Sequence, residues 1–281
     1  IDAVIVGAGF AGIYMLHKLR QQGLEARVIE AGSGVGGTWY WNRYPGARCD
    51  IPSMQYSYQF SEDLQQEWEW SEKYATQGEI LTYAEHVVER FGLRDGMTFN
   101  SRVLATHYLG EEERWQVHLD SGEEIQARFV VMATGCLSKP NYPNIDGLND
   151  ASVPVYHTAN WPHDGVDFTN MRVAVIGTGS SAIQSTPIIA EQAQSLTVFQ
   201  RTPNYSIPAY NEPLDPDYVA QLKSRYAEYR QENWARGFGA DFNENDQSAF
   251  DVSDDERQRA YEERWAKGGL AFLAAYNDLV F

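Results

Sequence analysis

The sequence predicts an α/β protein with two Rossmann-like dinucleotide-binding domains and a helical insert that begins in the second domain. Two glycine-rich segments support this prediction, G-A-G-F-A-G at residues 7–12 and G-T-G-S-S-A at residues 177–182. Each follows a short apolar run, at residues 3–6 and 173–176, where a buried strand would turn into a helix. This context distinguishes a dinucleotide site from a chance match to the G-x-G-x-x-G/A pattern.

The first half of the chain begins with a strand, a helix and a second strand. The helix carries apolar residues at helical spacing, Gly23 ends it, and residues 26–30 form the second strand. A glycine-rich loop and an aromatic stretch follow, and apolar residues at helical spacing then predict a helix over residues 79–91. Short strands are expected near residues 103–108, 115–119, 125–127 and 129–133.

Prolines and glycines mark the middle of the chain as a linker. The second strand–helix–strand unit follows it, and beyond Pro203 the pattern changes to helices broken by a polar loop near residues 237–250. Apolar and aromatic side chains fall on one side of these helices, which predicts a packed insert; they are Val219, Leu222, Tyr226 and Tyr229. We therefore expect the first part of one dinucleotide-binding domain at 1–137, a linker at 138–170, the first part of a second at 171–203, and an incomplete helical insert at 204–281.

Composition excludes several classes of partner. The chain has 281 residues and a net charge of −17, whereas duplex binding relies on clustered Lys and Arg. No apolar run approaches the roughly 18–20 residues that span a membrane, and no secretory signal is visible. Cys49 and Cys136 make no disulfide framework, which is typical of a reducing cytosol. We expect a cytoplasmic protein with no nucleic acid, membrane or metal partner.

The first glycine segment is expected to bind FAD. Glu30 ends the second strand, about 20 residues after the glycines, where its carboxylate can accept hydrogen bonds from ribose hydroxyls and would repel a 2′-phosphate. That pattern allows an NAD-like ligand or FAD. The additional glycines at 34, 36 and 37, followed by Thr38 and Trp39, favour the larger ligand. Cys49 has no nearby cysteine partner, which disfavours disulfide reductase chemistry.

The second glycine segment is expected to bind NADPH. Arg201, followed by Thr202, stands where the first unit has its acid, at the end of the next strand. A guanidinium group in this position can bind a 2′-phosphate. The alternative interpretation is an arginine that is merely solvated on the surface, and its equivalence in position to Glu30 argues against that.

Between and around the two sites, three segments resemble the type I Baeyer–Villiger monooxygenases. These segments are residues 36–50, residues 155–162 and the second glycine unit with residues 199–203. Residues 155–162 match the H-x-x-x-W-P core of the family's fingerprint, whereas Ala151 and Val153 replace its usual Phe and Gly. Members are about twice as long, and their second half completes both domains and supplies an active-site arginine. This chain has no candidate for that arginine, so we expect it to be the N-terminal part of a longer enzyme.

The resemblance implies an enzyme that uses FAD and NADPH to insert one oxygen atom of O2 into a ketone, through a C4a-peroxyflavin, to give an ester or lactone. Its partners would be a small-molecule ketone and O2, and it is expected to be a monomer. Asp50 aligns with a catalytic carboxylate that lies near the flavin and partners the missing arginine. His157 aligns with a linker residue that couples domain movement to catalysis, and Trp161 would pack the hinge.

The expected cofactor contacts fall into two sets. Those to FAD are Gly7, Gly9, Phe10, Gly12, Glu30, Gly37, Thr38, Trp39, Asp50, Tyr56 and Val103. Those to NADPH are Gly177, Thr178, Gly179, Ser180, Ser181, Gln184, Arg201 and Thr202. Two alternatives remain open: a flavin monooxygenase that oxygenates nitrogen or sulfur, and a nucleotide-binding fragment without activity.

Overall fold

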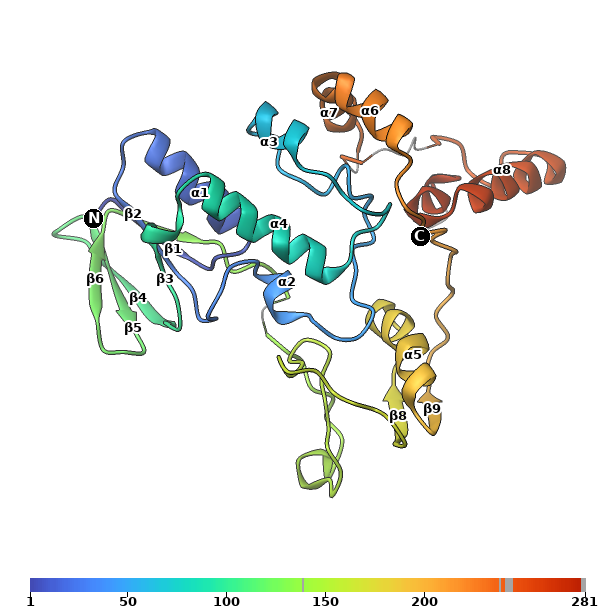
Figure 1. The fold of residues 1–281 in the computed structure, drawn as a ribbon, viewed down its shortest axis with the longest axis horizontal. Helices are drawn as coiled ribbons and strands as arrows, with labels where there is room; N and C mark the ends of the chain where they lie inside the picture. Colours follow the sequence, from blue (N-terminus) through green and yellow to red (C-terminus); the bar gives the residue numbers. More distant parts are fainter. Residues whose placement is uncertain (138, 238, 241–244, 279–281) are drawn as a thin grey trace. The chain divides into compact units, whose positions relative to one another are not determined.

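The computed structural model describes residues 1–137, 139–237, 239–240 and 245–278 (Figure 1). The chain divides into two compact units, each assembled from separate stretches of sequence. The first unit contains Ile1–Ala47, Gln77–Ala174 and Ile183–Thr197. The second contains Arg48–Thr76, Val175–Ala182 and Val198–Phe281.

A four-stranded parallel sheet forms the centre of the first unit. Its strands, in spatial order, are β3 (Met97–Thr98), β2 (Ala26–Ile29), β1 (Ala3–Val6) and β7 (Phe129–Met132). Strand β1, which lies between β2 and β7, is an unbroken apolar run because parallel strands are covered on both faces. Helix α1 (Phe10–Gln21) joins β1 to β2 and buries Ile13 and Leu16 completely. The predicted strand–helix–strand unit is therefore present, whereas the two-residue β3 was not predicted.

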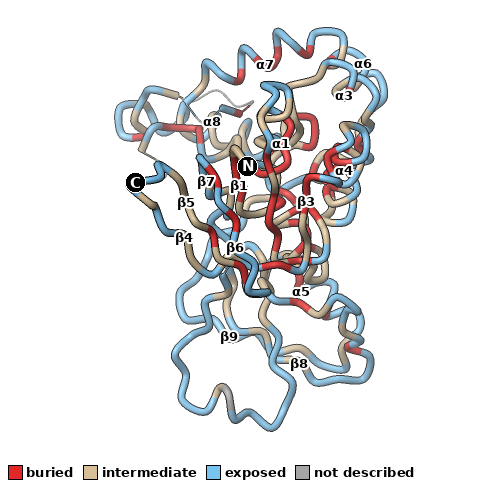
Figure 2. Tube along the Cα trace, turned by 90° about the vertical axis from the view of Figure 1, so that its left-hand side faces the viewer, coloured by how far each residue is buried: buried red, intermediate tan, exposed pale blue. Residues whose placement is uncertain are grey.

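Helix α4 (Gln77–Arg90) confirms the helix predicted over residues 79–91. Its buried residues recur at helical spacing and Gly92, with φ of 58°, follows its end. Figure 2 shows buried residues along both α4 and β1. The short helices α2 (Thr38–Trp41) and α3 (Glu62–Glu67) were not predicted, because four to six residues are too few to show a period.

Three of the four predicted short strands form an antiparallel sheet, and the fourth, predicted at 129–133, is β7 of the parallel sheet. The three strands are β4 (Val103–Leu109), β5 (Arg114–Leu119) and β6 (Glu124–Ala127), in that order. Val117, Leu119, Ile125 and Ala127 pack with residues of β1 and β2 in one buried cluster. Alternation along β6, exposed then buried, explains how one face covers the first sheet while the other meets solvent.

The second strand–helix–strand unit consists of β8 (Arg172–Ile176), α5 (Ser180–Gln192) and β9 (Ser195–Phe199). The two strands pair with each other, and both are mostly exposed in Figure 2. The preceding stretch is largely irregular apart from the 3₁₀ turn η2 (Leu148–Asp150). Another 3₁₀ turn, η1 (Arg94–Gly96), precedes β3.

Beyond β9 the chain is helical, as predicted. Helices α6 (Pro216–Ser224), α7 (Tyr226–Trp234) and α8 (Asp254–Lys267) are followed by the 3₁₀ helix η3 (Gly269–Ala274). Leu222, Tyr226 and Tyr229 are buried, as expected for a packed insert, whereas Val219 is only half-buried. The polar loop expected near residues 237–250 lies partly outside the described residues.

We predict that Gly12→Ala destabilises the chain, because a Cβ at this position would overlap the carbonyl oxygen of Gly7. Overpacking of this kind costs about 1–3 kcal/mol, and chemical denaturation measures the loss. The matched control is Gly78→Ala in α4, where an added Cβ meets no atom within 4 Å. This control should gain about 0.5–1 kcal/mol because alanine favours a helix. Equal effects of the two substitutions would contradict the packing argument.

Candidate functional site

The first glycine segment lies at the carboxyl edge of the parallel sheet. Val6 pairs with Ile29 and with Met132, so β1, β2 and β7 end side by side. Gly7 continues β1 by donating its N–H to the Ile29 carbonyl at 2.8 Å. Its φ of 104°, with a Cβ that would lie 2.7 Å from the Ala133 oxygen, admits only glycine. The edge of an open parallel sheet is where such folds bind nucleotides.

The N-terminus of α1 directly follows the glycine turn and carries no side-chain cap. Gly9 is the N-cap residue, no side chain caps the helix, and no acidic residue occupies its first turn. Phe10 begins the helix and contacts the Tyr83 ring edge to face, with the centroids 6.1 Å apart. The positive end of the helix dipole therefore lies directly after the glycine turn, with no carboxylate in the first turn to oppose an anion.

Glu30 is buried, with 5% of its surface exposed, and its carboxylate joins two loops. One oxygen accepts a hydrogen bond from the Ala8 N–H at 2.7 Å, and the other accepts one from the Gly32 N–H at 2.7 Å. A carboxylate has about four acceptor sites, so two remain for ribose hydroxyls. The geometry is therefore compatible with the predicted contact and adds a structural role that the sequence did not reveal.

The loop before α2 lies against the glycine turn. The Gly36 N–H donates to the Ala8 carbonyl at 3.0 Å, and a Cβ at Gly37 would lie 2.8 Å from the Gly9 Cα. Thr38 and Trp39 then begin α2, where the Trp39 side chain is 8% exposed and its carbonyl accepts a bond from the Gln77 amide. The structure thus brings most of the predicted contacts of the first site together in one unit.

Tyr40 is a positioning residue that sequence reasoning missed. Its hydroxyl accepts a hydrogen bond from the Ser33 N–H at 3.0 Å and pairs with the Ser33 hydroxyl at 2.7 Å. A Cβ at Gly32 or Gly34 would lie only 2.6 or 3.1 Å from its ring. These two glycines are the signal that was available, since they leave the space that the ring fills.

Three further residues predicted for the first site are on other segments of the chain. Val103 begins β4 and packs against the buried cluster under the antiparallel sheet. Asp50 and Tyr56 belong to the second unit, on the loop between Arg48 and Thr76. Asp50 lines a cavity of that unit, and Tyr56 donates its N–H to the Pro52 carbonyl at 3.0 Å.

The second glycine segment follows β8. The Gly177 N–H donates to the Phe199 carbonyl at 2.9 Å, and the Thr178 hydroxyl accepts a bond from the Asn204 amide at 2.8 Å. Ser180 and Ser181 begin α5, which has no acidic residue in its first turn. A Cβ at Gly179 would meet no atom within 4 Å, so protein packing does not explain this glycine.

The two predicted residues after β9, Arg201 and Thr202, are both exposed. Gln184 is assigned to a different unit from the other residues predicted to contact NADPH. It belongs to the first unit, where its amide oxygen accepts a hydrogen bond from the Tyr44 hydroxyl at 2.8 Å. Asn204, which contacts the glycine turn, was not predicted, because it lies outside the glycine pattern.

His157 is held within the linker. Its Nδ1 accepts a hydrogen bond from the Ala159 N–H at 3.1 Å, so the neutral ring carries its proton on Nε2, which donates to the Asn141 carbonyl at 3.3 Å. The ring also contacts Tyr142, with the centroids 4.7 Å apart. Trp161 is buried with Phe168 and Ile189, the latter on α5.

Both cysteines are free thiols. Burial raises the pKa of the Cys49 thiol to about 11, so almost none of it is the reactive thiolate at neutral pH. Cys136 is exposed. No helix in the described residues is long and apolar enough to cross a membrane. Across the same ranges, no three His, Cys, Asp or Glu side chains gather as metal ligands.

We predict that Glu30→Gln destabilises the first unit by about 1–3 kcal/mol, because the amide NH2 of glutamine would face a backbone N–H and leave a buried donor unpaired. Urea denaturation followed by circular dichroism measures the change. Glu25→Gln is the control, since this exposed residue contacts its neighbours through its backbone. A loss no greater than that of the control would refute the bridging role of Glu30.

Comparison with known proteins identifies relatives of the chain. A family model described as pyridine nucleotide-disulphide oxidoreductase matches residues 4–263. A Baeyer-Villiger monooxygenase from Pseudooceanicola batsensis is 41% identical over 271 residues, which are 95% of this chain and 49% of the relative. An oxidized steroid monooxygenase bound to NADP has a TM-score of 0.93 and 56% identity, covering 99% of this chain and 53% of that one. OTEMO in complex with FAD and NADP has a TM-score of 0.94 and 39% identity, covering 99% and 54%.

The chain spans about half the length of these proteins. The predicted fold class, two Rossmann-like units with helices after the second, is confirmed by these neighbours. The resemblance inferred from the sequence is confirmed as well, since relatives that match almost the whole chain include a Baeyer–Villiger monooxygenase. The chain belongs to the pyridine nucleotide-disulphide oxidoreductase family.

Proposed function

We propose that this chain is the N-terminal, nucleotide-binding part of a Baeyer–Villiger monooxygenase that uses FAD and NADPH to insert one oxygen atom of O2 into a ketone. The observation that carries this proposal is a pair of glycine turns, each followed by a helix and a second strand. The residue after that second strand is acidic in the first unit, Glu30, and the corresponding residue is basic in the second, Arg201. The relatives support the reaction class. Two free cysteines further support a cytoplasmic location, and we propose a monomer.

FAD is the proposed ligand of the first turn. The pyrophosphate would accept hydrogen bonds from the N–H groups at the start of α1, and the ribose would donate to Glu30. Bound flavin would supply the electron transfer and oxygen activation that side chains lack. The contact of Gly36 with Ala8 fixes the turn and the next loop together, so the phosphate-binding groups are already ordered.

NADPH is the proposed ligand of the second turn. The open space at Gly179 leaves room for a phosphate to approach the backbone, and the start of α5 carries no opposing charge. Arg201 would bind the 2′-phosphate through paired N–H donors. The neighbouring structure with NADP bound supports this assignment.

Asp50 and His157 have proposed roles outside the phosphate sites. Asp50 would hold a cationic group, such as an arginine, beside the reacting carbonyl, and its position on a cavity wall supports this role. His157 would position the linker, because its two ring nitrogens join residues 141 and 159. A rigid linker would transmit movement from one end to the other.

The proposed activity is tested with the full-length enzyme that carries this chain. We expect visible flavin absorbance that NADPH bleaches under anaerobic conditions, and benzyl acetate from phenylacetone in air, detected by mass spectrometry. Oxygenation of amines or sulfides without any ester would instead indicate a nitrogen- or sulfur-oxygenating enzyme. A protein without bound flavin would contradict the proposal and favour a nucleotide-binding role alone.

We predict that Arg201→Ala raises KM for NADPH about 10–100-fold, which corresponds to a charge-assisted hydrogen bond of about 1.5–3 kcal/mol. KM for NADH, which lacks the 2′-phosphate, should change little. Arg172→Ala is the control because Arg172 is an exposed arginine at the start of β8. Steady-state kinetics with both nucleotides measure the effect, and equal increases for NADPH and NADH would reject the assignment.

A further inference from the structure

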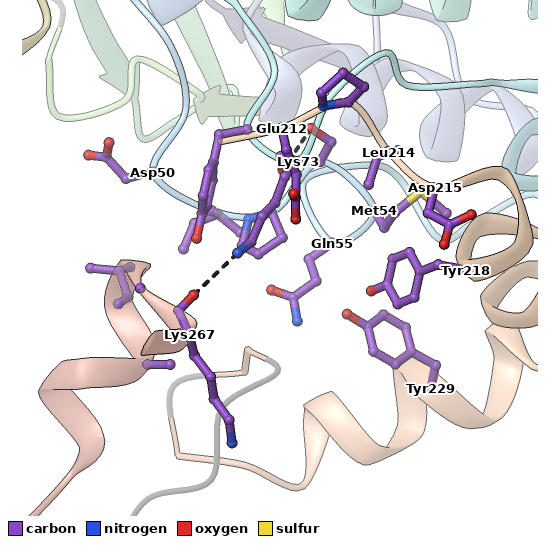
Figure 3. A pocket seen from close by; sticks show the side chains of 18 residues that line it. Asp50, Met54, Gln55, Lys73, Glu212, Leu214, Asp215, Tyr218, Tyr229 and Lys267 are labelled. Carbon is purple, nitrogen blue, oxygen red and sulfur yellow. Dashed lines mark hydrogen bonds between the residues drawn. The ribbon is translucent and has the colours of Figure 1, made fainter. Parts of the chain in front are cut away.

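The second unit contains a cavity of about 560 Å³ (Figure 3). Its walls come from the loop at residues 50–55, from residues 73–74, from residues 212–218 with Tyr229, and from residues 267–271. Cavities of roughly 300–1,000 Å³ bind drug-sized ligands. The space therefore suits a molecule considerably larger than a single-ring ketone.

Most of the cavity wall is apolar or aromatic. Met54, Leu214 and Leu270 contribute aliphatic surface, and Tyr218 and Tyr229 contribute rings. Figure 3 shows the two tyrosine hydroxyls and the Gln55 amide on the same side of the space. An apolar wall with a few polar groups is the usual composition of a site for a small organic ligand.

The side-chain amide of Gln55 is the polar group in the cavity wall whose N–H donor has no hydrogen-bond acceptor among the described residues. Its Nε2 is shielded from solvent and has no hydrogen-bond partner within the described part of the chain. A shielded donor without an acceptor costs free energy, so such a group calls for a ligand atom or another explanation. An acceptor oxygen on a ligand would satisfy it.

The loop that carries Gln55 is held firmly from outside the cavity. The Arg230 guanidinium donates to the Gln55 carbonyl at 2.8 Å, and the Tyr226 hydroxyl donates to the Met54 carbonyl at 2.7 Å. The Gln55 N–H donates to the Pro52 carbonyl at 2.9 Å. These bonds fix the backbone from which the Gln55 side chain extends, so a rotation of that side chain alone is enough to turn the shielded amide toward a ligand.

The charged residues of the wall indicate a neutral ligand. Asp50, Glu212, Asp215 and Lys267 are exposed, and Figure 3 shows the side chains of Asp50 and Lys267 directed away from Gln55. Asp215 caps α6 by accepting a bond from the Asp217 N–H at 2.9 Å. The Lys73 ammonium donates to the Lys267 carbonyl at 3.4 Å. Carboxylates and ammonium groups therefore line the same cavity, and this mixture of both signs favours a ligand without net charge.

We propose that this cavity binds a bulky, neutral ketone whose second oxygen, remote from the reacting carbonyl, accepts a hydrogen bond from Gln55 Nε2. The inference rests on the proposed ketone oxidation for the identity of the reacting group. Asp50, the proposed catalytic carboxylate, lies on a different part of the same wall (Figure 3). Gln55 is thus a specificity-determining residue rather than a catalytic one.

The test compares two isosteric ketones with the full-length enzyme. One is 4-[4-(dimethylcarbamoyl)phenyl]butan-2-one, whose amide oxygen accepts hydrogen bonds, and the other replaces the amide by a 3-methylbut-2-en-2-yl group of the same shape. In Gln55→Met, Kd for the amide should rise about tenfold, or about 1.4 kcal/mol, whereas the hydrocarbon should bind more tightly because the unpaired donor is gone. Calorimetry measures both, and kcat/KM is recorded in parallel.

Gln55→Glu is the second variant, since it keeps the size of the side chain and removes the donor. As in Gln55→Met, Kd for the amide ketone should rise relative to Kd for the hydrocarbon analogue. Gln231→Met, an exposed position on α7 outside the cavity, should keep the wild-type ratio of the two Kd values. An unchanged ratio in both Gln55 variants would overturn the inference. Binding with this dependence on Gln55 but no ester from either ketone would overturn the proposed reaction and leave the binding site standing.

Discussion

The buried carboxylate of Glu30 joins the parts of the first nucleotide site. It accepts hydrogen bonds from Ala8, in the glycine turn, and from Gly32, in the loop that follows β2, both at 2.7 Å. Unpaired, a carboxylate at this depth would be costly, so the two N–H groups are required by its burial. The same bonds orient the turn at the start of α1 and bring the loop against it, and Tyr40 then fills the space beside Gly32. The structure of both loops, and with it the proposed FAD site, therefore depends on one side chain.

The glycines of the two turns have different physical causes. In the first turn, a Cβ at Gly7 or Gly12 would collide with the chain itself, as would a Cβ at Gly37 in the loop that packs against the turn, so packing alone requires glycine. In the second turn, a Cβ at Gly177 or Gly179 would meet no atom within 4 Å. Gly177 is still required by its φ of 105°, whereas no contact within the described residues requires Gly179. Close approach of a ligand to the backbone is a sufficient reason for that glycine.

Sequence patterns predicted the elements whose signals are local. The glycine turns, the amphipathic helix α4 and the alternating strands β4 to β6 each carry their period or turn within a few residues. Strand β3 and helix α2 were missed because they are only two and four residues long. Tyr40 was missed as a positioning residue because its role appears only when the loop folds back on α2.

The cavity of the second unit could not be predicted from the sequence, because the contacts that form its wall join residues far apart in the chain. Arg230 reaches the Gln55 carbonyl across 175 positions of sequence, and Tyr226 reaches Met54 across 172. Both donors lie on α7, for which the sequence predicted only a packed helical insert. The burial of Tyr226 and Tyr229 agrees with that packing. The hydrogen bonds add a second consequence, because the same helix fixes the backbone that presents Gln55 to the cavity. A helix can therefore be buried for stability and, through the groups on its buried face, determine which ligand the neighbouring loop can receive.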